Sequence, residues 1–490
     1  MSLPRPAGLL GVTLAVTAVV GAATVTRPTA HATSDSTVAR PVQGVTLVCP
    51  DVPAPTADLS TATVVATSRP GDGEALVSRL GDPAPPLRFD LHVAAQPVTL
   101  PVGAPLVVTA SGPASGGLVV TRTTRGASGR DRGYSVDACT PPRTDAWFVG
   151  PSTAAGQGAA LHLVNAEAGT AQVSVRALSK DGPVEPVGLT GLVIPGHTAR
   201  DVPLEQLAPL QPALAVEVVA SQGRVASSVR EYRGLGAAKP GGVDAVPQAA
   251  GPEATVTIAG VVGLAGSSVI SESRMRQVLT VAVPGARDAT VRVEVTDPTG
   301  RIVPVGLDAV TVAAGTTRQV DLTPSLTQER ATVRVVSADG LGVLAGILVD
   351  AQVHIGDVHE TLQLGATPAL VGPTVVPDTR VGKDLDTFLG LTSPERDTTV
   401  VVTVGGVPAA VPVPAGRVVV YKAHVGSATG GALTVTPAAG SPPLWASAVI
   451  EELGYNGPLL GGTAVSGGLA DVVLPPARPD PGVPLVDSRR

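Results

Sequence analysis

The chain has 490 residues, of which 44% are hydrophobic, 15% are charged and only 2% are aromatic, and its formal net charge is -6. This length suits about three or four domains of roughly 100–150 residues each. Because charge of either sign is sparse, nucleic acid is excluded as an expected partner.

The amino terminus carries an uncharged stretch at residues 6–26, flanked by Arg5 and Arg27. As a helix rising about 1.5 Å per residue, it is long enough to cross a hydrocarbon layer of about 30 Å. Ala30-His31-Ala32 downstream matches a cleavage site. We predict that residues 1–32 are a signal peptide or an N-terminal membrane anchor, followed by a polar spacer at 33–43. The expected location is therefore extracytoplasmic, either secreted or anchored to the cytoplasmic membrane by residues 6–26.

The chain contains two cysteines, Cys49 and Cys139. An even pair in an exported chain predicts a disulfide, because thiols oxidise outside the cytoplasm. Free thiols or a metal-binding pair are the alternatives, although no C-x-x-C motif or histidine partner supports a metal site.

A spacing recurs three times along the chain. A glycine lies between two valine-rich runs, and an alanine in a short apolar run follows it thirty residues later. The pairs are Gly196 with Ala226, Gly315 with Ala345, and Gly416 with Ala446. Three such spacings with similar surroundings indicate a repeated structural unit.

Short runs in which valine alternates with polar residues, such as 291–295 and 333–335, are typical of half-buried strands. We predict an all-β fold of tandem immunoglobulin-like β-sandwich units after an N-terminal hydrophobic helix. The alternative is a β-propeller-like ring of the repeated units. The expected units are a first, divergent one with the cysteine pair at 44–145, and three more at 146–234, 254–352 and 374–454. Linkers are expected at 235–253 and 353–373, a terminal strand at 455–475 and a disordered tail at 476–490.

Hydrolase and nucleotide-binding signatures are absent from the sequence. The densest group of histidines and carboxylates is VHIGDVHE, with His354, Asp357, His359 and Glu360. Such groups can bind zinc or exchange protons, but His354 and His359 would point to opposite faces of one strand. We interpret the segment as a solvated connector and expect no metal and no cofactor.

Four arginines are clustered in the first unit just before Cys139: Arg122, Arg125, Arg130 and Arg132. Guanidinium groups at this density can contact phosphate or carboxylate groups of envelope polymers or lipids. The competing interpretation is a flexible charged loop.

The segments CPDVPAP (Cys49–Pro55) and WFVGPSTAAGQGAALHLVN (Trp147–Asn165), together with Cys139 and the repeated units, resemble an uncharacterised family of exported actinobacterial proteins. The family is known only as a domain of unknown function. The resemblance implies an envelope or secreted location and supplies no catalytic residues.

These observations predict a non-catalytic cell-envelope protein that acts as a β-domain scaffold or an interaction surface for an envelope protein or polymer. One alternative is an enzyme acting on envelope polymers, with acids such as Asp384, Asp386 and Glu395 in one cleft. Another is an accessory ligand-binding subunit of an envelope transport or assembly complex. The membrane would be a partner only through an uncleaved N-terminal helix.

Overall fold

The protein is described from a computed structural model. The described residues are 38–50, 57, 59–66, 73–91, 96–99, 104–112, 115–129, 131–184, 188–234, 242–264, 273–353, 358–370, 372–424, 431–454, 457–465 and 471–474. The leader predicted at 1–32 and the tail predicted at 476–490 lie outside them. Within the described residues, no helix has the length and apolar character needed to cross a membrane.

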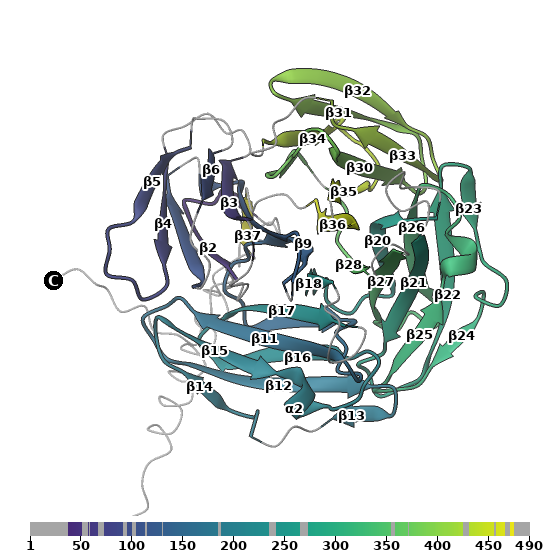
Figure 1. Ribbon diagram of the computed structural model, residues 1–490, viewed down its shortest axis with the longest axis horizontal. Helices are drawn as coiled ribbons and strands as arrows, with labels where there is room; N and C mark the ends of the chain where they lie inside the picture. Colours follow the sequence, from purple (N-terminus) through teal and green to yellow (C-terminus); the bar gives the residue numbers. More distant parts are fainter. Residues whose placement is uncertain are drawn as a thin grey trace, which may run out of the picture. The chain divides into compact units, whose positions relative to one another are not determined.

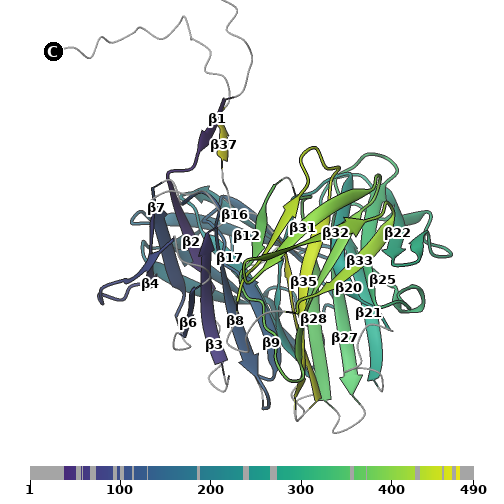
Figure 2. The same ribbon diagram turned by 90° about the horizontal axis from the view of Figure 1, so that it is seen from above.

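The chain forms two compact units. The described residues of the smaller unit are 38–40 and 471–474, and those of the larger unit lie between Pro41 and Val465. A two-stranded sheet joins β1 (Val38–Pro41) to β37 (Asp471–Leu474), as Figure 2 shows. The apolar run at 471–474 is therefore a strand, and its partner comes from the other end of the described chain.

The larger unit confirms the all-β prediction. Its strands form four pairs of antiparallel sheets, which we call modules 1 to 4 (residues 44–138, 145–249, 255–365 and 374–464; Figure 1). In each module one four-stranded sheet, here called the central sheet, has the last long strand of the module at its edge. The other sheet is called the second sheet.

The central sheets share one strand order. In module 1 it is β6 (Gln96–Thr99), β3 (Leu59–Ala66), β8 (Leu118–Gly126) and β9 (Gly133–Ala138). In module 2 it is β15 (Thr198–Pro203), β11 (Gln157–Asn165), β17 (Ala226–Arg233) and β18 (Val243–Val246). In module 3 it is β25 (Thr317–Asp321), β21 (Ser273–Ala282), β27 (Leu344–Val353) and β28 (Val358–Gly365). In module 4 it is β33 (Arg417–Lys422), β30 (Leu385–Ser393), β35 (Trp445–Gly454) and β36 (Gly457–Ala464).

The second sheets differ from one another in their number of strands, whereas the central sheets do not. Module 1 has β2 (Gly44–Cys49), β7 (Leu106–Ser111), β4 (Glu74–Arg79) and β5 (Leu87–Asp90). Module 2 has β13 (Gly182–Val184), β12 (Ala171–Ser179), β16 (Ala215–Gln222), β10 (Asp145–Val149) and β19 (Gln248–Ala249), with β14 (Leu192–Ile194) beside β12. Module 3 has β20 (Thr255–Val262), β26 (Arg330–Ser337), β22 (Ala289–Asp297) and β23 (Gly300–Ile302), with β24 (Val310–Val312) beside β22. Module 4 has β29 (Thr374–Val376), β34 (Leu433–Pro437), β31 (Thr398–Val404) and β32 (Val407–Val413). Among the described residues, α2 (Leu204–Leu207) and η2 (Thr323–Ser325) are single helical turns.

Each module encloses its own apolar core between its two sheets. In module 3, Val291, Val293 and Val295 of β22 are fully buried and pack in one cluster with Leu279 of β21 and Ile347 of β27. The valines alternate with polar residues, so one face of β22 is apolar, as the sequence pattern predicts. Modules 1, 2 and 4 have clusters drawn in the same way from both sheets.

The recurring alanines occupy equivalent places in three central sheets. Each alanine pairs with an apolar residue one strand away: Ala226 with Val164, Ala345 with Val281, and Ala446 with Leu391. The thirty-residue spacing is therefore the number of residues from the recurring glycine to this equivalent position in the central sheet.

The last strands of the four central sheets contact one another in a closed cycle. β9 contacts β18 and β36, and β28 contacts the same two strands. We call β9, β18, β28 and β36 the central strands. β18 and β28 lie in the segments predicted as linkers, and β36 lies in the segment predicted as a terminal strand. The apolar runs of β18, β28 and β36 are short and follow glycine-rich or charged stretches. The sequence pattern therefore did not assign these strands to the units that precede them.

A buried polar centre as the candidate functional site

An arginine of module 1 reaches two other modules at the central strands. The Arg132 guanidinium, just before β9, donates from Nη1 to Glu360 Oε2 at 2.7 Å and to the His359 carbonyl oxygen at 2.7 Å. Its Nη2 donates to the Pro458 carbonyl oxygen at 2.5 Å. Glu360 lies in β28 of module 3 and Pro458 in β36 of module 4, so this one side chain links three modules.

Glu360 is completely buried, with 0% of its side chain exposed. Its second oxygen accepts a hydrogen bond from the Leu460 amide at 3.2 Å. Burial raises the pKa of Glu360 to about 7, although the attraction of Arg132 acts in the opposite direction. The carboxyl group therefore changes charge near neutral pH.

Asp244 in β18 is a buried acid with a different set of partners. Its oxygens accept hydrogen bonds from the Gln363 amide at 2.7 Å and from the Ala245 amide at 2.8 Å. Both donors in the described structure are backbone amides. Burial raises the pKa of Asp244 well above its usual value, and the nearby carboxyl groups of Asp137 and Glu360 raise it further.

Asp137 in β9 is the third acid of this group, and it belongs to module 1. It is buried and accepts a hydrogen bond from Ser135 Oγ at 3.0 Å. Burial raises its pKa, and the positive charge of Arg230 is the strongest of the influences that lower it. Three adjacent central strands thus each contribute one buried carboxyl group.

A fourth carboxyl group connects modules 2 and 3. Glu231 in β17 accepts hydrogen bonds from the Ser152 amide at 2.8 Å and from Arg233 Nη2 at 2.7 Å. Its other oxygen accepts from Gln363 Nε2 of β28. Burial raises the pKa of Glu231. We call Arg132, Asp137, Glu231, Asp244, Glu360 and Gln363 the polar centre.

One further buried ion pair and one hydrogen bond cross the module boundaries and involve residues outside the polar centre. Arg330 in β26 pairs with Glu451 in β35, and the two side chains are only 1% and 4% exposed. Thr123 in β8 donates a hydrogen bond to Asp378 of module 4. Polar groups buried between modules require specific partners, so these contacts fix how neighbouring modules meet.

The four arginines predicted to contact anions have different surroundings. Arg122 is buried and donates from Nη1 to the Pro50 carbonyl oxygen at 2.8 Å and to that of Ala104 at 3.2 Å. Arg125 pairs through two nitrogens with Glu452 of module 4, the Nε to Oε2 distance being 2.7 Å. Arg132 belongs to the polar centre, and Arg130 lies outside the described residues.

These arginines therefore do not form one exposed patch. An envelope anion would need accessible guanidinium groups, whereas Arg122 and Arg132 are buried and donate to oxygens of the protein. Anion contact by this cluster stays a prediction. In the described structure, Arg122, Arg125 and Arg132 link segments of the fold through hydrogen bonds.

The disulfide predicted from the cysteine pair is present between Cys49 and Cys139. Cys49 ends β2 of the second sheet, and Cys139 follows β9 directly. The bond therefore fastens a central strand to the opposite sheet of module 1. A disulfide is typical of an oxidising, extracytoplasmic compartment.

The interpretation of VHIGDVHE as a solvated connector is wrong for its described part. His359 and Glu360 lie in β28, and Glu360 is fully buried. His359 Nδ1 lies 3.1 Å from Asp350 Oδ1. His354 and Asp357 lie outside the described residues. No group of metal-binding side chains occurs among the residues that the structure covers.

The acids considered for an enzyme make surface contacts. Asp386 accepts a hydrogen bond from Lys422 at 2.8 Å, and Glu395 accepts one from Arg334 at 3.3 Å. Asp384 lies at a turn with a φ of 59°.

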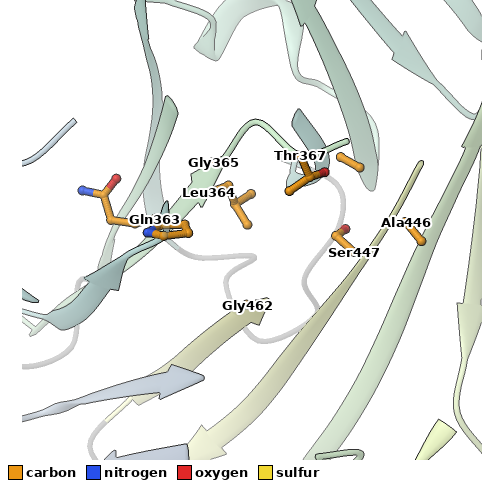
Figure 3. Close-up of a pocket in the computed structure, with 9 residues that line it drawn as sticks. Gln363, Leu364, Gly365, Thr367, Ala446, Ser447 and Gly462 are labelled. Carbon is orange, nitrogen blue, oxygen red and sulfur yellow. The ribbon is translucent and has the colours of Figure 1, made fainter. Parts of the chain in front are cut away.

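A small cavity borders the polar centre at Gln363. It is also lined by Ser447, Thr367 and Gly462, which Figure 3 shows around it. Its volume is about 10 Å³. A water molecule needs roughly 10–15 Å³ of such space, so this cavity has room for one water at most.

Modules of two antiparallel sheets, joined through buried ion pairs, define an all-β protein. The chain belongs to the family of unknown function DUF5719, whose pattern matches residues 91–417. No curated protein matches the sequence.

A solved structure described as "Ca2+-stabilized adhesin helps an Antarctic bacterium reach out and bind ice" shows weak similarity. The match has 13% sequence identity and a TM-score of 0.12, and it covers 87% of this chain and 99% of the other chain. A TM-score this low carries no argument about fold or function.

Proposed function

We propose that the protein is a non-catalytic cell-envelope scaffold that presents a fixed set of β-module surfaces to an envelope protein or polymer. The observation that carries this proposal is the contact of Arg132 with Glu360 and Pro458, which joins three modules through one buried side chain. A flexible string of domains would not need such a contact.

Several features support this proposal. Each module encloses its core between two antiparallel sheets, which agrees with an immunoglobulin-like sandwich as the module fold. Sandwiches present loops at both ends, and loops are the usual contact surfaces. The disulfide and the uncharged segment at 6–26 support export, with the mature chain either released or anchored.

The proposal is tested by affinity capture from envelope extract, with mass spectrometry of the bound protein and glycan. The bait is the chain from residue 33, compared with an Arg132→Met variant that weakens the module junctions. Arg318→Met is the matched control, because Arg318 is exposed and its described hydrogen bond goes to the nearby Thr311 carbonyl oxygen.

We expect wild type and Arg318→Met to capture the same specific partner and Arg132→Met to capture less of it. Folded, disulfide-bonded protein that captures no specific partner would contradict the proposal, as would turnover of an envelope polymer by the purified chain. Equal capture by Arg132→Met, with its junctions shown to be loosened, would contradict the requirement for a fixed arrangement.

A further inference from the structure

The centre of the larger unit concentrates carboxyl groups that come from different modules. Asp137 lies on β9, Asp244 on β18 and Glu360 on β28, and these strands contact one another in order. All three side chains are buried. The sequence separates them by more than a hundred residues at each step, so only closure of the modules brings them together.

We propose that the polar centre is a proton-linked latch: the closed arrangement of the modules retains protons on its buried carboxyl groups, and their loss at alkaline pH loosens the module junctions.

Asp244 provides the geometric basis for the latch. Its two described hydrogen-bond donors are backbone amides, and the charges of Asp137 on β9 and Glu360 on β28, two strands that contact β18, raise its pKa further. An ionised carboxylate buried without a cationic partner is strongly unfavourable, and a group in this position stays neutral instead. A proton on Asp244 removes that cost and also its repulsion from the two neighbouring acids.

Every element packed against β18 contributes charged or titratable groups. The strand β9 and its start contribute Arg132, Tyr134 and Asp137; β17 contributes Arg230, Glu231, Tyr232 and Arg233; and β28 contributes His359 and Glu360. Arg122 and His162 also act on Asp137.

The arginines close to the centre have defined acidic or backbone partners. Arg132 binds Glu360, Arg233 binds Glu231, and the positive charge of Arg230 lowers the pKa of Asp137. The described hydrogen bonds to Asp244 come from backbone amides and not from a guanidinium group. Full ionisation would therefore leave the centre with uncompensated negative charge in a buried site.

The sign of the pH dependence follows from the direction of the pKa changes. The pKa values of Asp137, Glu231, Asp244 and Glu360 are all higher in the folded protein than in an unfolded chain. The stability that these four groups contribute is complete when the pH lies below their pKa values in the unfolded chain. It is lost as the pH rises through their pKa values in the folded protein, and the folded pKa of Glu360 is about 7. The junctions therefore weaken between mildly acidic and alkaline pH.

Hydrogen exchange of the full-length protein, followed by mass spectrometry from pH 5.5 to 8.5 and corrected for intrinsic rates, tests the latch. We expect protection of β9, β18 and β28 to fall with pH relative to β31, which lies in the second sheet of module 4 and pairs with strands of that sheet. Each proton released on opening lowers the protection about tenfold per pH unit.

Asp244→Asn is the informative variant, because asparagine resembles the protonated acid in shape and charge. We expect it to reduce the pH slope by about one proton, whereas Asp308→Asn, at an exposed position, should leave the slope unchanged. Protection that does not depend on pH in the wild type would overturn the latch. So would an Asp244→Asn protein that keeps the wild-type slope.

If Asp244→Asn does not fold, Glu360→Gln takes its place in the same experiment. Proton release during unfolding of the wild type, measured at pH 6 in unbuffered solution, gives a readout without any variant. Net uptake of protons by the unfolding chain from the solution would also overturn the proposal, because the raised pKa values require release.

Discussion

Gly133 is where the close contact between β9 and β18 can be tested most directly. Its φ is 152°, and a Cβ at this position would lie 2.3 Å from the Val243 carbonyl oxygen and 2.9 Å from the Val243 nitrogen. Both atoms belong to the backbone, so a side chain at Gly133 cannot be accommodated by a rotamer change. A Gly133→Ala substitution must either strain β9 or push β18 away.

Gly300 provides the matched comparison. Its φ is 150°, and nothing lies within 4 Å of a Cβ built there. Gly300→Ala should therefore cost only the backbone strain of about 1–3 kcal/mol. Gly133→Ala should cost that strain plus about 1–3 kcal/mol for overpacking against Val243.

Urea denaturation and thermal melting of the two variants and the wild type measure this difference. We expect a clearly lower midpoint for Gly133→Ala than for Gly300→Ala, together with faster hydrogen exchange in β9 and β18. Equal losses in the two variants would refute the reasoning, because they would mean that β9 and β18 do not approach as closely as described.

Three other substitutions follow from buried contacts. Arg132→Met leaves Glu360 without its cation and should cost about 3–5 kcal/mol in thermal melts at pH 8. Replacing Cys49 and Cys139 by serine opens a loop with a sequence separation of 90, and should cost about 4–5 kcal/mol in urea denaturation by the chain-entropy relation. Tyr134→Phe should leave the melting temperature unchanged or raise it, because Tyr134 Oη is buried with no hydrogen-bond partner among the described residues.

The controls are specific to each change. Arg318→Met should alter stability by less than about 0.5 kcal/mol, as expected for an exposed side chain. Reductant should lower the stability of the wild type and leave the double serine variant unaffected. A loss of more than about 1 kcal/mol for Tyr134→Phe would show that the hydroxyl does make a stabilising hydrogen bond.

The local features of the fold could be predicted from the sequence because they repeat with a short period. The alternation at Val291, Val293 and Val295 identified a strand, and these side chains are buried on one face. The cysteine pair likewise predicted the disulfide from compartment and number alone.

The polar centre could not be predicted in this way, because its partners are distant in the chain. Arg132 and Glu360 are 228 residues apart, and neither lies in a motif. The central strand β36 lies in the segment predicted as a terminal strand, but its close approach to module 1 could not be predicted. Gly461 is required there, since a Cβ would lie 2.4 Å from Tyr134 Cδ1. One signal was present in β28, where Glu360 precedes the alternating pair Leu362 and Leu364.

The closed cycle of contacts among the central strands has a consequence for how this chain can evolve. In a linear array of repeats, a duplication or deletion adds or removes one unit, and the flanking interfaces remain usable. Here the loss of one module would leave two central strands facing a gap, and an extra module would have no place between them. The module count is thus fixed by geometry, so variation is confined to the sequences of individual modules and to their loops.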